Sequence, residues 1–247
     1  MEIKVVSFNI RCANDAHGHS VAKRAPRLYS AIRDINADVI AFQEYNPRWE
    51  RHIRRFFGGD YVIFNKYRGD AESTPILWRR DKFICRSSGW FWLSDTPDVP
   101  SGGWDELYGL NRICLYAVLE EKDNGLAFAV MNTHFGFGSA GQVKSAALIS
   151  SRAAYISNLP TVVVGDFNMT DKSAGYAEMT RMFADANIAN DARPTFHGYD
   201  PNGREASRID YCFVGNGAVS VGQTLIDATF GGKYPSDHFG LCTTVRI

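Results

Sequence analysis

The sequence predicts an α/β fold in a single domain, and three observations support this prediction. The chain has 247 residues, a length that suits one large α/β domain or two small ones. Short segments rich in β-branched residues alternate with segments whose apolar residues recur at helical spacing. No internal repeat, low-complexity tract or linker interrupts the alternation, so we expect residues 1–247 to form one domain.

The N-terminal part of the chain predicts two strands and two helices. The strands span residues 3–11 and 37–44, which are rich in β-branched side chains. The first helix is expected to begin near Pro26, because proline suits a first helical turn. The second begins at Pro47 and ends at the glycines that follow Phe57. Their inward faces are Leu28, Ala31, Ile32 and Ile35 in the first helix, and Trp49, Ile53, Phe56 and Phe57 in the second.

The remaining elements follow from the same two periodicities. A hairpin of residues 113–120 and 126–131 closes at Asn124 and Gly125, a strong turn signal, and its second strand runs into Asn132 and His134. Further strands are expected at 61–66, 75–78, 83–86, 161–164, 209–214 and 241–247. Further helices are expected at 143–159, which Pro160 ends, and at 173–182, with Ser173 as its cap.

Residues 90–111 break this pattern with a long stretch of aromatic residues among prolines and glycines. A loop of this length in a compact domain usually has a function. It forms either a substrate wall or lid, or a packed surface loop, and the sequence leaves both open. In the first case we expect Trp92 or Trp104 to line the cleft next to Arg112. A second irregular stretch, residues 191–205, contains His197 as a further candidate.

The composition is that of an ordinary soluble globular chain. Hydrophobic residues make up 45% and charged residues 22%, and 27 Lys and Arg balance 27 Asp and Glu. A neutral chain has no global field to attract polyanions, which argues against a non-specific nucleic-acid binder. We expect a monomer without membrane insertion, because no apolar run could span a bilayer. The expected location is the cytoplasm, or outside it if a signal peptide has been trimmed from this sequence.

The cysteines are odd in number, scattered and without the paired spacing of a metal or redox motif. Free cysteine behaves as a small hydrophobic residue. We therefore expect reduced core residues, with no zinc site and no disulfide framework, at Cys12, Cys85, Cys114, Cys212 and Cys242.

Acid, amide or imidazole side chains stand at the ends of six predicted strands. In the sequence TVVVGDFN, for example, Asp166 and Asn168 project to the same side of the chain. A carboxylate is a hard ligand for Mg²⁺ or Mn²⁺, and an amide can hold a phosphate oxygen or a water. Each group alone could be a turn residue or a surface ion pair, but their repetition favours one shared site. The six groups are Asn9 with Arg11; Glu44; Asn132 with His134; Asp166 with Asn168; Asp210; and Asp237 with His238.

Six short motifs carry these residues, and in this order they resemble the endonuclease/exonuclease/phosphatase superfamily of deoxyribonuclease-like phosphohydrolases. The motifs are SFNIR (7–11), FQE (42–44), NTHFG (132–136), GDFN (165–168), RIDYCFV (208–214) and SDHFG (236–240). The resemblance spans nearly the whole chain. It implies a four-layer α/β sandwich, with two mixed, mostly antiparallel sheets packed face to face and helices outside. It also implies Mg²⁺- or Mn²⁺-dependent hydrolysis of a phosphoester.

Carried over motif by motif, the resemblance implies a role for each residue. Glu44 would be the principal metal ligand, with Asn9 beside it and Asp237 as a further ligand. Asp166 and Asn168 would orient the attacking water and hold the phosphoryl oxygens. The chemistry suits a phosphoester, because a metal neutralises its charge and lowers the pKa of a bound water.

The remaining roles concern proton transfer and phosphate binding. His238 would be the general base or would orient the water, with Asp210 fixing its tautomer. His134 would act on the phosphate or leaving group, with Glu72 as its paired acid. Arg112 and Asn132 are the expected phosphate contacts.

Two departures limit what the resemblance implies about substrate. Arg11 stands where abasic-site endonucleases carry an acid, which argues against a second acidic metal site near Asn9. The sequence FWLSDTP (91–97) resembles an uncharacterised bacterial branch. The leading hypothesis is a phosphodiesterase or nuclease, acting on nucleic acid or a small phosphorylated molecule. The alternatives are a phosphomonoesterase for a sugar or inositol phosphate, and a binding module that has lost catalysis.

Overall fold

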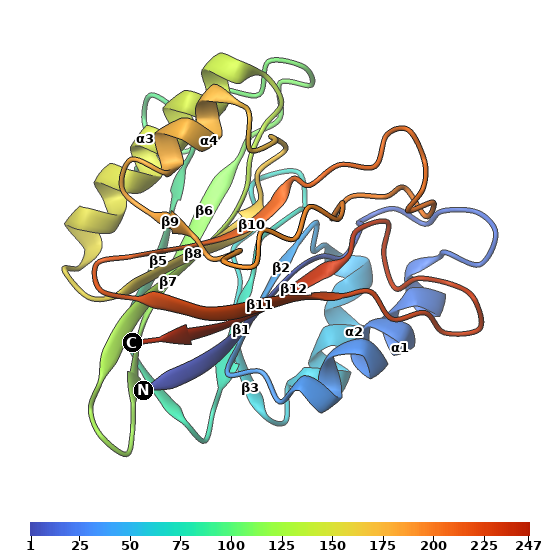
Figure 1. Ribbon diagram of the computed structural model, residues 1–247, viewed down its shortest axis with the longest axis horizontal. Coiled ribbons are helices and arrows are strands. Elements are labelled where there is room, and N and C mark those ends of the chain that lie inside the picture. Colours follow the sequence, from blue (N-terminus) through green and yellow to red (C-terminus); the bar gives the residue numbers. More distant parts are fainter.

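The computed structural model describes all 247 residues as two six-stranded sheets packed face to face, with helices on both outer sides (Figure 1). The order of the first sheet is β11-β12-β1-β2-β4-β3, and that of the second is β5-β6-β7-β8-β10-β9. The first sheet comprises β1 (Glu2–Asn9), β2 (Val39–Gln43), β3 (Tyr61–Phe64), β4 (Ile76–Arg79), β11 (Val219–Ile226) and β12 (Gly240–Arg246). The second comprises β5 (Phe83–Trp92), β6 (Ile113–Glu121), β7 (Ala127–His134), β8 (Thr161–Asp166), β9 (Ala184–Asp185) and β10 (Asp210–Gly215).

The helices form the two outer layers. They are α1 (Val21–Ile32), the short 3-10 helix η1 (Arg33–Ile35), α2 (Pro47–Phe57), α3 (Ser139–Ile156) and α4 (Ala174–Met179). Figure 1 shows α1 and α2 on the side of the first sheet, and α3 and α4 on the side of the second. None of these helices combines the length and apolarity needed to cross a bilayer.

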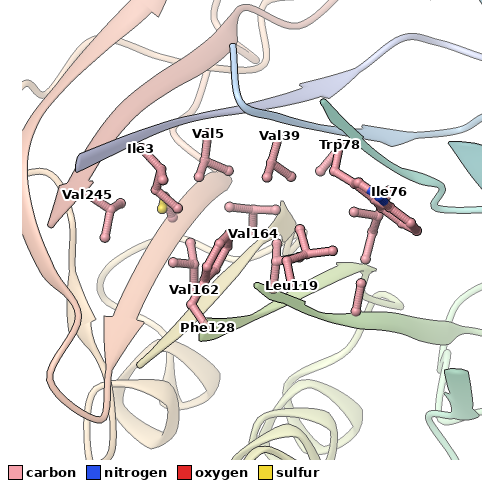
Figure 2. Close-up of a cluster of buried hydrophobic side chains, with 14 of the residues drawn as sticks. Ile3, Val5, Val39, Ile76, Trp78, Leu119, Phe128, Val162, Val164 and Val245 are labelled. Atoms are coloured by element: carbon pink, nitrogen blue, oxygen red, sulfur yellow. The ribbon is translucent and has the colours of Figure 1, made fainter. Parts of the chain in front are cut away.

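Three separate apolar clusters lie between the four layers. The central cluster joins the two sheets through residues such as Val5 and Val39 on one side and Val162 and Val164 on the other (Figure 2). The second cluster packs α1 and α2 on the first sheet, and the third packs α3 and α4 on the second. The four-layer sandwich that the resemblance implied is therefore confirmed.

Each sheet contains one parallel pair of strands among antiparallel neighbours. In the first sheet β1 runs parallel to β2, and in the second β7 runs parallel to β8. Parallel strands end at the same edge of their sheet. Asn9 and Glu44 thus emerge together from one sheet, and His134 and Asp166, which are register partners, emerge from the other.

Several element boundaries differ from the sequence predictions. Helix α1 begins at Val21 rather than near Pro26, which lies exposed inside the helix and leaves the Ala22 carbonyl without its helical N–H donor. Strand β5 continues through Trp92, so the irregular stretch begins only at Leu93. Strands β9 and β11 were not predicted at all. Strands β5 and β11 are sheet edges with exposed polar residues and a register shift, and these features hide their alternation.

Candidate active site

A cavity of about 640 Å³ opens where the carboxyl ends of the two parallel pairs meet. Its walls contain nine of the residues that the sequence singled out: Arg11, Glu44, Glu72, Arg112, His134, Asp166, Asn168, Asp237 and His238. Its other lining residues are Arg68, Tyr108, Leu110, Phe137, Met169, Thr170, Phe196, Glu205, Ser207 and Ile209. We call this cavity the cleft.

Unusual backbone conformations direct several side chains into the cleft. Glu44 and Asn168 have positive φ angles of 58° and 49°, which residues other than glycine rarely adopt. Gly165 lets β8 approach β7 closely, because a Cβ at this position would lie 2.2 Å from the carbonyl oxygen of Thr133. A larger residue there would push Asp166 out of line with His134.

Asn9 connects the two halves of the site. Its buried amide nitrogen donates to Glu44 Oε1 at 3.1 Å and to Asp166 Oδ2 at 2.9 Å. The backbone N–H of Cys12 donates to the second oxygen of Glu44 at 2.8 Å. Burial raises the pKa of Glu44, but His134 and the Cys12 amide lower it by more, so its pKa falls to about 2. Glu44 is therefore ionised at neutral pH.

Asp166 and Asn168 lie beside His134 in the wall of the cleft. The Asn168 amide nitrogen lies 3.1 Å from His134 Nε2, and Asp166 Oδ2 lies 3.5 Å from the same atom. Burial raises the pKa of Asp166, and the charge of Asp210 adds to this effect. On its other side, His134 Nδ1 lies 3.6 Å from Glu72 Oε1. Glu72 therefore lies beside His134, and their functional pairing stays a prediction.

His238 and Asp210 form the closest imidazole–carboxylate pair at the site. His238 Nδ1 lies 2.9 Å from Asp210 Oδ2, and its Nε2 lies 3.8 Å from Asp166 Oδ2. Burial lowers the pKa of His238, but Asp210, Asp166 and Asp237 outweigh it and raise the pKa to about 10. Without another cation, the imidazolium balances the surrounding carboxylates.

Arg11 occupies the flank of the cleft beside Asp237. Its Nε lies 3.5 Å from Asp237 Oδ2 and 3.1 Å from Asp15 Oδ2. Ser236 donates its hydroxyl to the other oxygen of Asp237 at 3.1 Å. Burial also raises the pKa of Asp237. The arginine that replaces an acid in the first motif is therefore a cation within the site.

Two buried arginines line the opposite part of the cleft. Arg112 donates through Nη2 to Asp105 Oδ2 at 3.0 Å, while its buried Nη1 has no hydrogen-bond partner. Arg68, which sequence reasoning did not identify, pairs with Asp70 and with Glu72 at 3.0 Å. No sequence pattern marks it, because a spacing of four residues favours an ion pair on a helix and residues 68–72 form a loop. The unpaired Nη1 of Arg112 leaves a donor for an anionic group.

Asn132 does not contact the cleft, so its expected role in phosphate binding is wrong. It is fully buried, and its amide nitrogen donates to the carbonyl oxygens of Phe42 and Pro75 at 2.8 and 2.9 Å. Its oxygen accepts from Gln43 Nε2 at 2.7 Å. These bonds cross from one sheet to the other, so Asn132 joins the sheets beneath the site.

The expectation that Trp92 or Trp104 lines the cleft is also wrong. Trp92 is the last residue of β5, and its side chain packs in the core between the sheets. Trp104 packs against the cluster under α3, where Lys144 Nζ lies 5.4 Å from its ring centroid. The same stretch instead contributes Tyr108 and Leu110 to the cleft.

Two further residues lie next to the site without lining it. His197 is 3% exposed; its Nδ1 accepts from the backbone N–H of Tyr199 at 3.1 Å, and its ring lies 4.2 Å from that of Phe239. Burial lowers the pKa of His197 to about 4. Arg24, which sequence reasoning missed, is fully buried and donates to the carbonyls of Ile10, Arg11, Ala13 and His19. Its side chain therefore fixes the loop that carries Arg11.

The donor set suits a hard divalent cation. Oxygen ligands from Glu44, Asp166 and Asp237 line one cleft, and Asn9 adds an amide beside them. Burial raises the pKa values of Asp166 and Asp237, so both carboxylates would ionise more readily beside a further positive charge. Asp210 Oδ1 is buried and has no hydrogen-bond partner. A bound Mg²⁺ or Mn²⁺ would supply this positive charge.

Comparison with known proteins agrees with the fold and the motifs. The profile of the Endonuclease/Exonuclease/phosphatase family matches residues 6–238, and the chain therefore belongs to this family. An uncharacterised mimivirus protein, L388 of Acanthamoeba polyphaga mimivirus, is 31% identical over 185 residues, covering 69% of this chain and 68% of its own length.

Two solved structures from Bacteroides thetaiotaomicron are similar over almost their whole length. One is described as an endonuclease/exonuclease/phosphatase family protein; it is 29% identical, with a TM-score of 0.90, and covers 99% of this chain and 97% of its own. The other is a mannosyl-6-phosphatase, 28% identical, with a TM-score of 0.86 over 99% of this chain and all of its own. The family is hydrolytic and includes phosphatases, phosphodiesterases and nucleases.

Proposed function

We propose that the cleft hydrolyses phosphoesters with the help of a bound Mg²⁺ or Mn²⁺. The observation that carries this proposal is that one cavity contains both carboxylates that could bind a cation and an arginine that could bind an anion. Carboxylates line one part of the cleft, two of them with pKa values raised by burial, and Arg112, whose buried Nη1 has no hydrogen-bond partner, lines another. An anionic phosphate between a cation and a guanidinium would satisfy both.

Glu44 and Asp237 would hold the ion, with Asn9 supporting Glu44. When bound, the ion neutralises the phosphate and lowers the pKa of a water molecule. Asp166 and Asn168 would orient this water and the phosphoryl oxygens.

Beside a bound cation His238 would be neutral, and it would then accept the proton of the water at Nε2, because Asp210 engages Nδ1. His134 stands where it can act on the phosphate or the leaving group.

We further propose that the substrates are phosphodiesters. Apolar and aromatic side chains line several parts of the cleft, including Tyr108 and Phe137, which contact each other, and Phe196, which packs on His238. A diester carries organic groups on two sides of phosphorus and could use more than one of these surfaces.

A phosphomonoesterase is the second candidate, because a specific observation favours it. Arg68 and Arg112 both line the cleft and are both buried, and a doubly charged terminal phosphate needs more than one cation. The similarity to a mannosyl-6-phosphatase supports the same alternative.

One panel of assays tests the reaction and separates the two ester classes. The substrates are bis-p-nitrophenyl phosphate, p-nitrophenyl phosphate, mannose 6-phosphate, an inositol phosphate and a single-stranded oligonucleotide. Turnover should need Mg²⁺ or Mn²⁺ and should disappear with excess EDTA. Calorimetry should detect Mn²⁺ binding that Glu44→Gln weakens. Full activity in EDTA would refute the proposal, while binding without turnover of any phosphoester would indicate a silent binding module.

A further inference from the structure

A second group of ligand-type side chains adjoins the cleft on the far side of Glu44. It consists of the thiol of Cys12 and one carboxylate oxygen each from Glu44 and Glu72, all within 4.8 Å of one another. The three residues come from three separate loops: the one after β1, the one after β2 and the one before β4. Only the fold brings them together, so the scattered cysteine spacing gave no sign of this cluster.

The cluster is open to solvent by its own route. A separate cavity of about 560 Å³ is lined by Cys12 and Glu72, together with Asn46, Arg48 and Asp70. Glu72 lines this cavity and the catalytic cleft. An ion can therefore reach Cys12 without passing through the catalytic cleft.

A buried nitrogen without a hydrogen-bond partner lies beside Glu72, one member of this cluster. Nδ1 of His134 makes no hydrogen bond, although the residue is only 7% exposed, and it lies 3.6 Å from Glu72 Oε1. Arg68 binds this oxygen at 3.0 Å, so the arginine leaves the second oxygen of Glu72 for another cation. The cluster thus holds sulfur and oxygen donors, and its Glu72 also lies beside an unused imidazole nitrogen.

We propose that Cys12, Glu72 and Glu44 form a second cation site, selective for a thiophilic divalent ion such as Zn²⁺. A site made only of oxygen donors would favour Mg²⁺ or Mn²⁺, whereas a thiolate shifts the preference toward Zn²⁺. On binding, the metal–sulfur bond replaces the S–H bond of Cys12, and the proton leaves to solvent. No oxidant or reductant is involved.

The second site shares Glu44 with the catalytic centre, which makes it inhibitory; this consequence rests on the proposed function. An ion at Cys12 draws the Glu44 carboxylate away from the ligand position that the cleft requires. It also engages Glu72, the acid beside His134. Zn²⁺ bound outside the cleft would therefore lower the Mg²⁺-supported rate.

Co²⁺ is a suitable probe because a Co²⁺–thiolate bond gives a charge-transfer absorption that oxygen ligands do not give. The wild-type protein should show this absorption in the presence of excess Mg²⁺, and Cys12→Ser should lose it. Cys85→Ser and Cys242→Ser are matched controls, since both cysteines are also half-buried, and both variants should keep it. Glu72→Gln keeps every thiol and should weaken Co²⁺ binding by at least about tenfold.

An absent absorption in the wild type, or one that persists in Cys12→Ser, would overturn the proposal. With Mg²⁺ present, the Zn²⁺ concentration for half-inhibition should rise at least about tenfold in Cys12→Ser. Equal Zn²⁺ sensitivity of the two proteins would overturn the inhibitory role. The spectroscopic test needs no turnover, so inactivity toward every phosphoester would refute the proposed function and leave this test intact.

Discussion

Asp210 Oδ2 lies 2.9 Å from His238 Nδ1, on the side of the ring that faces away from the cleft. If Asp210 acts only by orienting this imidazole, the two residues work as a unit. Asp210→Asn and His238→Ala should each lower kcat by about 10²- to 10⁴-fold. The double variant should be little worse than the worse single variant, because losses within one unit are non-additive.

The measurement is kcat for the best substrate, with folding checked by circular dichroism. Asp185→Asn serves as a control, because Asp185 pairs with Arg208 away from the cleft lining. Its kcat should stay close to that of the wild type. Losses that simply multiply in the double variant would mean that Asp210 and His238 act separately.

Arg112 should contribute to binding of the phosphate through the nitrogen that has no partner. Arg112→Lys keeps the charge but cannot hold Asp105 and a phosphate at the same time. A charge-assisted hydrogen bond contributes about 1.5–3 kcal/mol. We therefore expect kcat/KM to fall by about 10- to 150-fold, as measured by initial rates. Arg152→Lys, in an ion pair with Asp98 outside the cleft, should change kcat/KM little; equal effects would exclude a direct role for Arg112.

The site residues were predictable from sequence where strand direction alone determines the outcome. Asn9, Glu44, His134 and Asp166 follow strands that run parallel in pairs, so their approach follows from topology. The layers themselves came from the resemblance, because alternation of strands and helices does not specify how two sheets stack.

The errors concern side chains whose direction depends on packing. Asn132 was expected in the cleft, but it lies two positions before His134, the last residue of β7, and the two sheets bury it. Trp92 is buried because β5 is longer than its polar central residues indicate. Arg24 has no carboxylate partner among its hydrogen bonds, so no charge pattern in the sequence marks it.

Tyr108 should determine preference for the organic part of the substrate. It is 62% exposed, lines the cleft and meets Phe137 edge-on at a centroid distance of 5.3 Å. A lost stacking contact costs about 1–3 kcal/mol. Tyr108→Ala should therefore lower kcat/KM for the preferred substrate about 5- to 100-fold, but much less for bis-p-nitrophenyl phosphate.

The matched control is Tyr155→Ala, since Tyr155 is 83% exposed on α3 and does not line the cleft. It should leave both substrates unaffected. If Tyr108→Ala reduced the two rates equally, the segment would support the fold rather than recognise the substrate.

His197 should make the stability of the fold depend on pH. Its pKa is about 4 in the folded protein, because burial disfavours the imidazolium, and about 6.5 in an unfolded chain. Below pH 6.5 the unfolded state binds more protons, so the free energy of unfolding declines as the pH falls toward 4. The full difference corresponds to about 3 kcal/mol at most. Above pH 6.5 this contribution is fully present.

His197→Asn removes the titration but keeps an acceptor for the Tyr199 N–H, which now donates to His197 Nδ1. The variant should be less stable at pH 7, because it loses the contacts with Tyr234 and Phe239. Urea unfolding at pH 7 and pH 4.5 should nevertheless show a smaller loss on acidification than in the wild type. His17→Asn, at an exposed histidine, should retain the wild-type dependence. Equal losses in the wild type and His197→Asn would mean that other groups control acid stability, because the buried imidazole would then contribute nothing to the pH dependence of the free energy of unfolding.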